Sequence, residues 1–415
     1  MSYDLIVVGG GPAGSSAAWR AATAGARVLV VDKAVFPRDK PCGDGLTPRA
    51  VASIGALGLE NELKAFNRVD KLRVNGAGRT LTFDWPASDS FPDHGYVVAR
   101  TDLDEMMLRH AQNTGAEVRE GVSVVGPLIE DGAVRGVITK HNGTTEELRA
   151  SVVIAADGAS SRIARGVGMV RDPKRPIAVA MRAHFEAKRP ASDDNVIESH
   201  LELRDGDDLL PGYGWIFPMG EGRINVGVGI LSTYKGWQKV NNAHLMDAYI
   251  RSMPPEWELP DVSSLRESGQ LKGWRLPMGL CIKHPWRPGV LAVGDAAGVV
   301  NPFNGEGISI AYETGRLAAD AVDLALLSGD GLALQTYTQR LEEVYGLYFK
   351  VARTFVKAIG NPAVMRELTR VGMHSRTLME WVLRIMANLL RPDEIGPAEA
   401  VYRTFAALVA TAQVR

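Results

Sequence analysis

The sequence predicts an α/β fold that combines a parallel sheet with an antiparallel sheet and a helical C-terminal region. Short runs rich in Val and Ile, such as residues 4–8 and 151–156, each end at a glycine or aspartate turn, as buried parallel strands do. Residues 177–270 contain strands in which apolar and polar side chains alternate, which is typical of an antiparallel sheet with one solvated face. Beyond residue 307 the apolar residues recur at helical spacing.

The composition is that of a globular protein, with 46% hydrophobic and 23% charged residues among 415. A net charge of −1 argues against a nucleic-acid partner. The two cysteines, Cys42 and Cys281, exclude a disulfide framework and predict a reducing compartment. None of the eight histidines has metal-ligand spacing to a second ligand, so we expect no metal. The longest uncharged stretch, Leu5–Trp19, is too short to span a bilayer and no basic leader precedes it, so we expect a cytoplasmic protein.

The first strand is predicted over Asp4–Val8 and is followed by a glycine-rich turn and a helix over Ser15–Ala24. Gly9, Gly11 and Gly14 form a G-x-G-x-x-G pattern in that turn. The first glycine permits the tight turn, the second lets a pyrophosphate approach the backbone, and the third lets the helix pack closely on the strand. The N-terminus of the helix then offers free N–H groups to phosphates.

Two later strands are each predicted to end at a carboxylate. Arg27–Val31 ends at Asp32, 18 residues after the last motif glycine, where a carboxylate accepts hydrogen bonds from a ribose. Ser151–Ala156 ends at Asp157-Gly158. These elements, in register with the first strand, predict a dinucleotide site at the carboxyl ends of the parallel strands.

A further strand over Gly289–Val293 indicates which dinucleotide binds. It ends at Gly294-Asp295, and a helix opens around Gly307. This arrangement places a carboxylate beside a ribityl chain and helix N–H groups near an electron-accepting ring. A flavin uses both features, whereas a nicotinamide has no ribityl chain. A strand-end turn with a helix cap is the alternative interpretation of each motif alone.

The ordered set of these motifs, over nearly 300 residues, resembles the FAD-binding domain of the p-hydroxybenzoate-hydroxylase-like flavoproteins. The resemblance implies that FAD is the cofactor, that Asp32 binds the adenosine ribose, that Asp295 binds the ribityl chain and that Arg100 lies near the phosphates. The residues that it implies for FAD binding are Gly9, Gly11, Pro12, Ala13, Gly14, Asp32, Lys33, Cys42, Gly43, Asp44, Gly45, Arg100, Val124, Asp157, Asp295, Pro302, Gly305, Gly307 and Ile308.

Two segments distinguish among the hydroxylases, halogenases and prenyl-lipid reductases of that superfamily. Residues 36–45 (FPRDKPCGDG) resemble the Cys-Gly loop of the geranylgeranyl reductase family, although Asp44 stands among the glycines. Residues 211–218 (PGYGWIFP) resemble the Y-x-W-x-F-P motif of that family. Tyr213, Trp215 and Phe217 share one face of a strand and form an apolar wall suited to a long hydrocarbon substrate. An ordinary turn and an ordinary sheet core are the alternatives.

The sequence thus resembles the geranylgeranyl reductase family, and most closely its menaquinone-reducing branch. The resemblance implies an FAD-dependent oxidoreductase that adds two hydrogens across an isoprenyl C=C of a prenylated lipid. Reduced FAD supplies a hydride and an acid must supply a proton. By the resemblance Cys42, Asp44 and Glu306 lie near the ring, and we expect Cys42 to be catalytic. The alternatives are a geranylgeranyl or archaeal-type prenyl-lipid reductase, an aromatic monooxygenase, and a lipid-binding protein with a remnant fold.

The sequence predicts a discontinuous domain organisation. No second dinucleotide motif is present, so NAD(P)H or a redox protein must reduce the flavin directly. The predicted parts are an FAD-binding domain of residues 1–73, 100–170 and 282–330, a substrate domain of residues 74–99 and 171–281, and a helical region of residues 331–415.

The C-terminal region combines an apolar row with positive charge. Apolar residues at 378, 381, 382, 385, 386, 389 and 390 predict one helical face, and helix breaks are expected at Gly360–Pro362, Pro392 and Pro397. Between residues 350 and 391, eight Lys and Arg stand against two Glu. An apolar face beside a basic face is typical of a helix on an anionic membrane, so we expect peripheral association with the inner face of the cell membrane. Packing on the protein body and a dimer contact are the alternatives.

Overall fold

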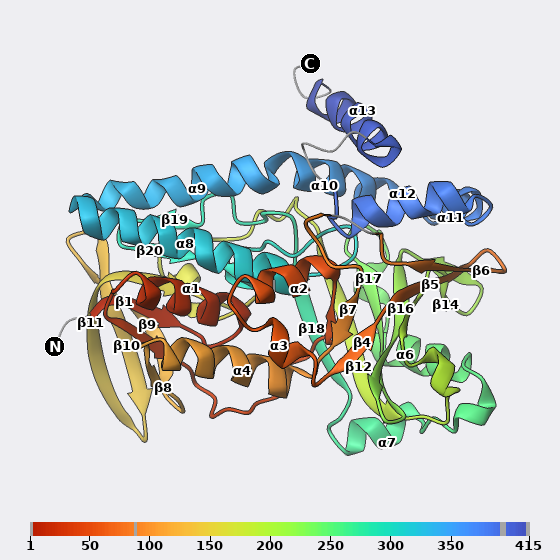
Figure 1. Ribbon diagram of the computed structural model, residues 1–415, viewed down its shortest axis with the longest axis horizontal. Helices are drawn as coiled ribbons and strands as arrows, with labels where there is room; N and C mark the ends of the chain where they lie inside the picture. The colour runs from red at the N-terminus through yellow and green to blue at the C-terminus, as the bar shows by residue number, and fades with distance from the viewer. Residues whose placement is uncertain (1–2, 87–88, 391–395, 412–415) are drawn as a thin grey trace.

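The computed structural model describes residues 3–86, 89–390 and 396–411. An eight-stranded sheet with the order β19-β20-β11-β1-β2-β8 forms one half of the molecule, and the β9-β10 hairpin extends from β11 (Figure 1). The pairs among β20, β11, β1, β2 and β8 are parallel. The strands are β1 (Tyr3–Val8), β2 (Val28–Val31), β8 (Glu117–Arg119), β9 (Ser123–Glu130), β10 (Ala133–His141), β11 (Thr144–Ala155), β19 (Trp286–Arg287) and β20 (Val290–Ala292).

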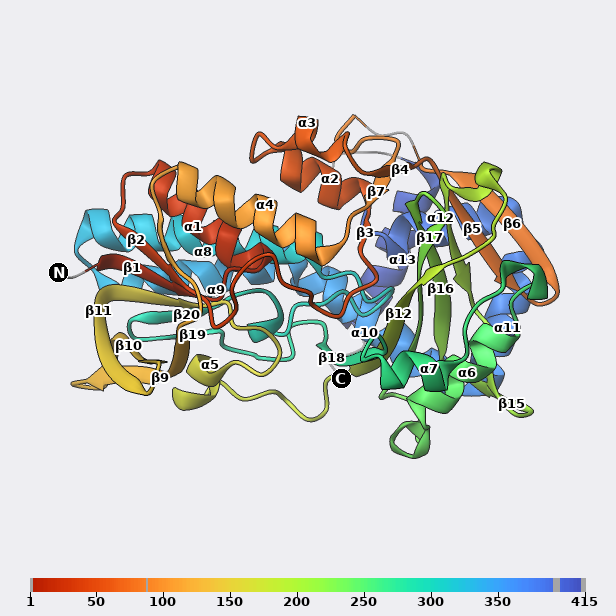
Figure 2. The same cartoon turned by 90° about the horizontal axis from the view of Figure 1, so that it is seen from below.

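Helices α1 (Pro12–Thr23), α4 (Arg100–Asn113) and α8 (Ile308–Ser328) cover one face of the parallel strands, and β9 and β10 lie on the other side (Figure 2). The predicted strands are unbroken apolar runs in the sequence because other elements cover both faces of the sheet. Close packing of α1 on α8 depends on Gly315, where a Cβ atom would lie 2.3 Å from the Ala13 carbonyl oxygen.

A seven-stranded sheet with the order β18-β12-β17-β16-β13-β5-β6 forms the second half. Its pairs are antiparallel, as the alternating pattern predicts, except that β13 runs parallel to β5. The boundary predicted after residue 73 falls inside β5, so we propose that the substrate domain begins at Lys71. The strands are β5 (Lys71–Gly76), β6 (Arg79–Asp84), β12 (Ile177–Glu186), β13 (Val196–His200), β16 (Gly212–Gly220), β17 (Arg223–Leu231) and β18 (Lys272–Pro277).

Smaller elements complete the two halves. Helices α6 and α7 share a buried apolar cluster with one face of the second sheet, which leaves the other face toward the first half. The remaining elements of this part are β3 (Gly45–Leu46), α2 (Pro48–Gly55), α3 (Glu60–Leu63), β4 (Asn67–Val69), β7 (Gly95–Val97), α5 (Arg162–Gly166), β14 (Leu203–Asp205), β15 (Asp208–Leu210), α6 (Asn242–Arg251) and α7 (Val262–Glu267).

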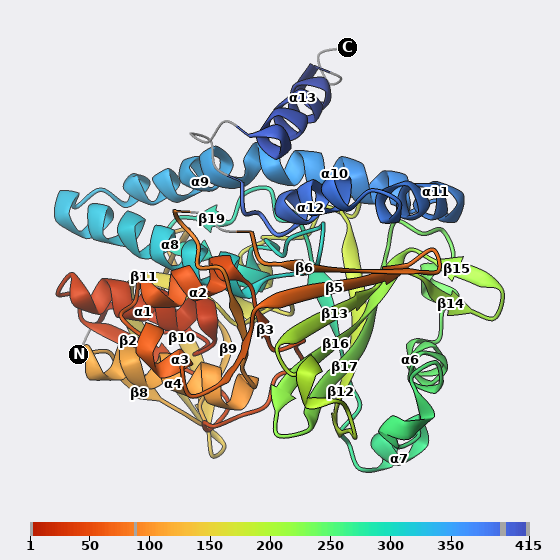
Figure 3. The same ribbon diagram turned by 45° about the vertical axis from the view of Figure 1, so that its right-hand side comes forward.

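The C-terminal helices run along one side of both halves, and α13 projects from that side (Figures 1 and 3). A π-helical turn over Glu342–Gly346 joins α9 to α10. The breaks predicted at Gly360–Pro362 and Pro397 are confirmed, a further break at His374–Ser375 was not predicted, and Arg391 and Pro392 lie outside the described residues. The helices are α9 (Thr336–Leu341), α10 (Leu347–Ile359), α11 (Pro362–Met373), α12 (Arg376–Met386) and α13 (Pro397–Thr411).

The apolar row predicted over residues 378–390 covers the protein body. Val382, Leu383 and Leu389 belong to the apolar cluster that contains Leu72 and Phe83 of the β5-β6 hairpin. Helix α12 ends at residue 386, so the last two positions of the row lie beyond it. None of the described helices is long and apolar enough to cross a membrane.

Candidate functional site

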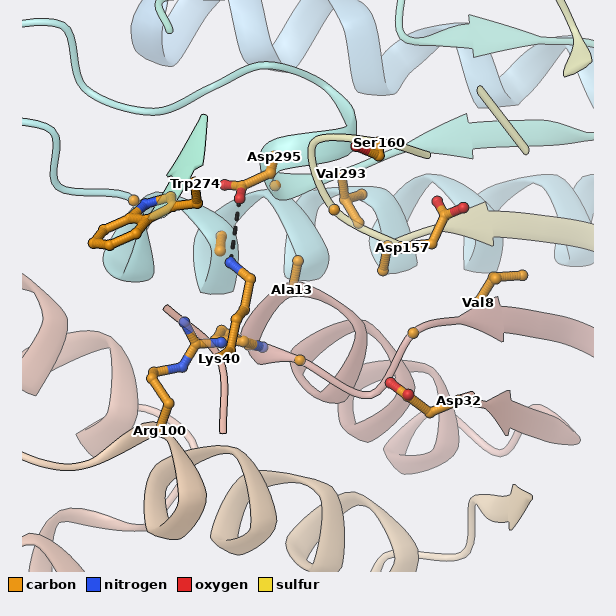
Figure 4. Close-up of a pocket in the computed structure, with 18 of the residues that line it drawn as sticks. Val8, Ala13, Asp32, Lys40, Arg100, Asp157, Ser160, Trp274, Val293 and Asp295 are labelled. Atoms are coloured by element: carbon orange, nitrogen blue, oxygen red, sulfur yellow. Dashed lines mark hydrogen bonds and ion pairs between the residues drawn. The ribbon is translucent and has the colours of Figure 1, made fainter. Parts of the chain in front are cut away.

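A cavity of about 590 Å³ lies where four parallel strands end. Val8, Val31, Ala156 and Val293, at the carboxyl ends of β1, β2, β11 and β20, all line it. Ligands of open α/β sheets bind at this edge because the strand ends leave a crevice there. Figure 4 shows Asp32 and Asp157 toward one end of the cavity and Trp274 toward the other.

The glycine-rich turn places the N-terminus of α1 against this cavity. Gly9 has φ +104°, in the left-handed region that favours glycine, and a Cβ atom on Gly14 would lie 1.8 Å from the Gly9 carbonyl oxygen. The N-cap residue of α1 is Gly11, which has no side chain to cap the helix, and Gly11, Pro12 and Ala13 line the cavity. The exposed N–H groups and the helix dipole therefore favour a phosphate group here.

Two arginines add positive charge to the same wall. The Arg100 guanidinium donates to both carboxylate oxygens of Asp104, at 2.7 and 2.6 Å, and Arg38 lies 2.6 Å from the same carboxylate. Arg100 is 4% exposed and Asp104 is fully buried. Because two guanidiniums share one carboxylate, a positive charge remains for an anionic ligand beside Gly11.

Three carboxylates line the cavity at the predicted positions. Asp32 accepts hydrogen bonds from the N–H groups of Gly10 and Ala34, both at 2.8 Å, which fixes its orientation after β2. Asp157 accepts from the Arg162 N–H at 2.7 Å, and burial raises the pKa of its carboxyl group.

Asp295 follows β20 and lies 3.4 Å from Lys40 Nζ, across the cavity (Figure 4). An uncapped helix end, two arginines and three carboxylates fit the diphosphate, ribose and ribityl groups of FAD.

Toward Trp274 the lining of the cavity also includes apolar side chains (Figure 4). Trp274 and Leu276 of β18 line it together with Cys42 and Gly43 of the Cys-Gly loop. Burial raises the pKa of the Cys42 thiol, the charge of Asp44 adds to this effect, and Arg100 opposes it. The thiol is therefore neutral at pH 7.

Glu306 opens α8 beside this end of the cavity. Its carboxylate accepts from the backbone N–H and the hydroxyl of Ser309, at 2.7 and 2.6 Å. Burial raises the pKa of this carboxyl group although both hydrogen bonds oppose the shift. The side chain is thus occupied in capping the helix.

The three motif aromatics do share one face of β16. The ring centroids of Tyr213 and Trp215 lie 5.9 Å apart, and those of Trp215 and Phe217 lie 6.2 Å apart. Trp215 is only 4% exposed, whereas the Tyr213 hydroxyl donates to the Asn304 carbonyl oxygen at 2.5 Å, next to the cavity loop. A Cβ atom on Gly43 would lie 3.1 Å from the Phe217 ring, so the wall packs directly on the Cys-Gly loop.

Most of the predicted cofactor residues come together in the cavity. Those that line it are Gly9, Gly11, Pro12, Ala13, Asp32, Lys33, Cys42, Gly43, Arg100, Val124, Asp157, Asp295, Gly305, Gly307 and Ile308. Gly14, Asp44, Gly45 and Pro302 do not line it; Pro302, for example, packs against Gly279.

The prediction missed several residues that line the cavity, among them Arg38, Lys40 and Trp274. The two cations stand in the same FPRDKP segment that leads to Cys42, and their charge was an available signal. Trp274 is a lone aromatic on β18, which no sequence pattern linked to the site.

The family model described as FAD binding domain matches residues 2–345 of the chain. The chain therefore belongs to this FAD-binding family, and the predicted fold class and cofactor are confirmed. It is 40% identical over 404 residues to the menaquinone reductase of Mycobacterium tuberculosis, covering 97% of this chain and 95% of that protein. It is 34% identical over 360 residues to the digeranylgeranylglycerophospholipid reductase 2 of Methanopyrus kandleri, covering 85% of each. The chain is thus a member of the geranylgeranyl reductase family, as its two motifs predict.

Two solved structures share the fold. The geranylgeranyl bacteriochlorophyll reductase-like protein of Thermoplasma acidophilum aligns with a TM-score of 0.78 at 24% identity, over 97% of this chain and 99% of that one. The myxobacterial chondrochloren halogenase aligns with a TM-score of 0.72 at 24% identity, over 98% and 97%. The same backbone thus appears in a reductase-like protein and in a halogenase.

Substitution of Arg100 by Met is expected to weaken FAD binding by at least about tenfold, because a charge-assisted hydrogen bond to a phosphate contributes on the order of 1.5–3 kcal/mol. Titration of the apoprotein with FAD, followed by flavin fluorescence, measures this change. Arg109→Met on the same helix is the control, since Arg109 does not line the cavity and its partners are Glu105 and Glu120. Equal affinities of both variants would contradict the assignment of Arg100.

Proposed function

We propose that this flavoprotein reduces an isoprenyl C=C in the side chain of menaquinone. The observation that carries the proposal is a cavity that fits FAD and is lined by Trp274 and Leu276 beside the Cys-Gly loop, in a chain 40% identical to a menaquinone reductase over 97% of its length.

Phe217, against the Cys-Gly loop, belongs to the same cluster as Leu72, Phe83 and Trp85 of the second sheet and Leu383 of α12. These side chains fill the space between the second sheet and α12 and leave a gap of only about 10 Å³, so a hydrocarbon chain that entered here would have to displace them.

The similarity to menaquinone reductases over nearly the whole chain supports the quinone as substrate. The relative from Methanopyrus kandleri makes a geranylgeranyl lipid the second candidate. Both candidates carry isoprenyl chains, so the same apolar lining of the cavity suits either of them.

Reduced FAD, when bound, supplies the hydride for this reaction. Burial raises the pKa of the Cys42 thiol, which therefore keeps its proton at pH 7, and the residue lines the cavity with its thiol beside Arg100. An isolated alkene accepts a hydride poorly, so an acid that protonates carbon in the same step lowers the barrier. We propose that Cys42 supplies this proton and that Trp274 and Leu276 exclude water from it.

Anaerobic incubation of the reduced holoprotein with menaquinone is expected to yield a quinone that is heavier by two hydrogens on its side chain, as measured by mass spectrometry. A parallel reaction contains a geranylgeranyl lipid. Reduction of that lipid alone would overturn the menaquinone assignment. A product that gains oxygen, only in air, would indicate a monooxygenase instead.

Substitution of Cys42 by Ala is expected to lower the rate of substrate reduction by about 10²-fold or more, as for the loss of a general acid, while FAD stays bound. Cys42→Ser keeps a hydrogen-bond donor of similar size, but a hydroxyl is a much weaker acid than a thiol, so this variant should lose nearly as much activity as Cys42→Ala. Cys281→Ala is the matched control, because Cys281 is a buried free cysteine that does not line the cavity. Single-turnover oxidation of the flavin by the substrate measures these rates. Wild-type rates in Cys42→Ala would exclude the proposed role.

We further propose that the protein docks on an anionic lipid surface through α11 rather than α12. Val364, Leu368 and Val371 are 37%, 47% and 48% exposed and, at spacings of four and three residues, lie on one side of α11. Arg366 and Arg370 are exposed on the same helix. Apolar side chains beside cations match a membrane interface that carries negative charge.

The Leu368→Glu variant is expected to bind vesicles that contain phosphatidylglycerol at least about tenfold more weakly, because it places a carboxylate in the apolar row. Co-sedimentation with the vesicles measures the binding. Leu327→Glu serves as the control, since Leu327 is 81% exposed at the end of α8, at the opposite end of the molecule from α11 (Figure 1). If both variants bind vesicles like the wild type, α11 is not the docking surface.

A further inference from the structure

Three side chains of the second sheet hold the Cys-Gly loop from outside the cavity. The Cys42 carbonyl oxygen accepts from Asn225 Nδ2 at 2.8 Å and from Arg182 Nε at 3.3 Å. Asp44 Oδ2 lies 2.8 Å from Asn225 Nδ2 and 2.7 Å from His184 Nε2. The loop that lines the cavity is therefore bonded to β12 and β17 by side chains rather than by strand pairing.

The amide oxygen and both amide N–H groups of Asn225 have hydrogen-bond partners in this arrangement. It is fully buried on β17, and its Oδ1 accepts from the indole N–H of Trp215 at 2.9 Å. Because an indole nitrogen only donates, this contact defines which side of the amide is oxygen. Both N–H groups of Asn225 then donate to the loop, one to Cys42 and one to Asp44.

Asp44 occupies a position that glycine would occupy more easily. Its φ is +62°, in the left-handed region, which costs a residue with a Cβ atom on the order of 1 kcal/mol. Its carboxyl group is fully buried, and no described residue bonds its Oδ1. A strained backbone and a buried carboxylate are both unfavourable, so compensating contacts with Asn225 and His184 hold them in place.

We infer that Asn225, Asp44 and His184 form a positioning unit that fixes the Cys-Gly loop against the aromatic wall. Asn225 bonds both the indole of Trp215 and the backbone carbonyl of Cys42. These two bonds fix the distance between the aromatic wall and the Cys-Gly loop. The carbonyl of Cys42 is held toward the sheet, whereas its thiol lies beside Arg100. The inference rests on the FAD site and does not depend on which prenyl lipid is the substrate.

The test compares Asp44→Gly, Asn225→Ala and the double variant by hydrogen–deuterium exchange of residues 38–46 and by FAD titration, without a prenyl substrate. Glycine accepts φ +62° without strain, so Asp44→Gly removes the side chain while the backbone conformation stays favourable. We expect each single variant to speed exchange of the loop amides and to weaken FAD binding about tenfold, as for the loss of a hydrogen bond to a charged group. The double variant should equal a single variant, since each breaks the same unit.

Conservative variants separate positioning from a general loss of stability. Asp44→Asn keeps an acceptor and tolerates a positive φ, and His184→Gln keeps a donor, so both should restore the slow exchange and the FAD affinity. Asn75→Ala is the matched control, because it removes an Asn–His contact of 3.2 Å in the same sheet, away from the loop. Wild-type loop exchange and FAD affinity in Asp44→Gly would overturn the inference, as would losses in the double variant that multiply.

Discussion

The close approach of the α1 N-terminus to the end of β1 is the constraint on which the rest of the site depends. No Cβ atom fits at Gly14 against the Gly9 carbonyl, nor at Gly315 against Ala13, so α1 is held between the sheet and α8. In that position the uncapped N–H groups of α1 face the cavity. The position of α1 also determines how far Asp295, at the end of β20, lies from the phosphate site. A wider spacing would move the phosphate, ribose and ribityl contacts apart from one another, because each comes from a different strand end.

The electrostatic character of the cavity changes along its length. At the phosphate end Arg38 and Arg100 share Asp104, which leaves positive charge for an anion. At the ring end burial raises the pKa values of the Cys42 thiol and the Glu306 carboxyl group. Trp274 and Leu276 line the cavity there, and the Arg100 guanidinium lies beside the Cys42 thiol. Apolar side chains at this end suit hydride transfer to an alkene, because they keep water from the reacting carbons.

The C-terminal helices show the limits of periodicity. Residues 378–390 and the outer row of α11 both have helical apolar spacing, yet the first contacts the β5-β6 hairpin and the second faces solvent. The spacing is the same because a helix needs one apolar side whether it packs on a sheet, on a partner protein or on a lipid surface. Only the tertiary structure shows that the apolar row of α12 packs on the sheet, whereas the apolar row of α11 is exposed.

The sequence alone determined the parallel strands, the glycine turn, the three carboxylates and the Cys-Gly and aromatic motifs, because each is local and has a fixed spacing. It predicted the FAD site for that reason, with Asp32, Asp157 and Asp295 at the strand ends where they are found. Only the tertiary structure decided that Arg38, Lys40 and Trp274 line the cavity, and that Asn225 joins Trp215 to Cys42. Asn225 and Cys42 are 183 residues apart, and such a contact exists only once the second sheet has packed against the loop.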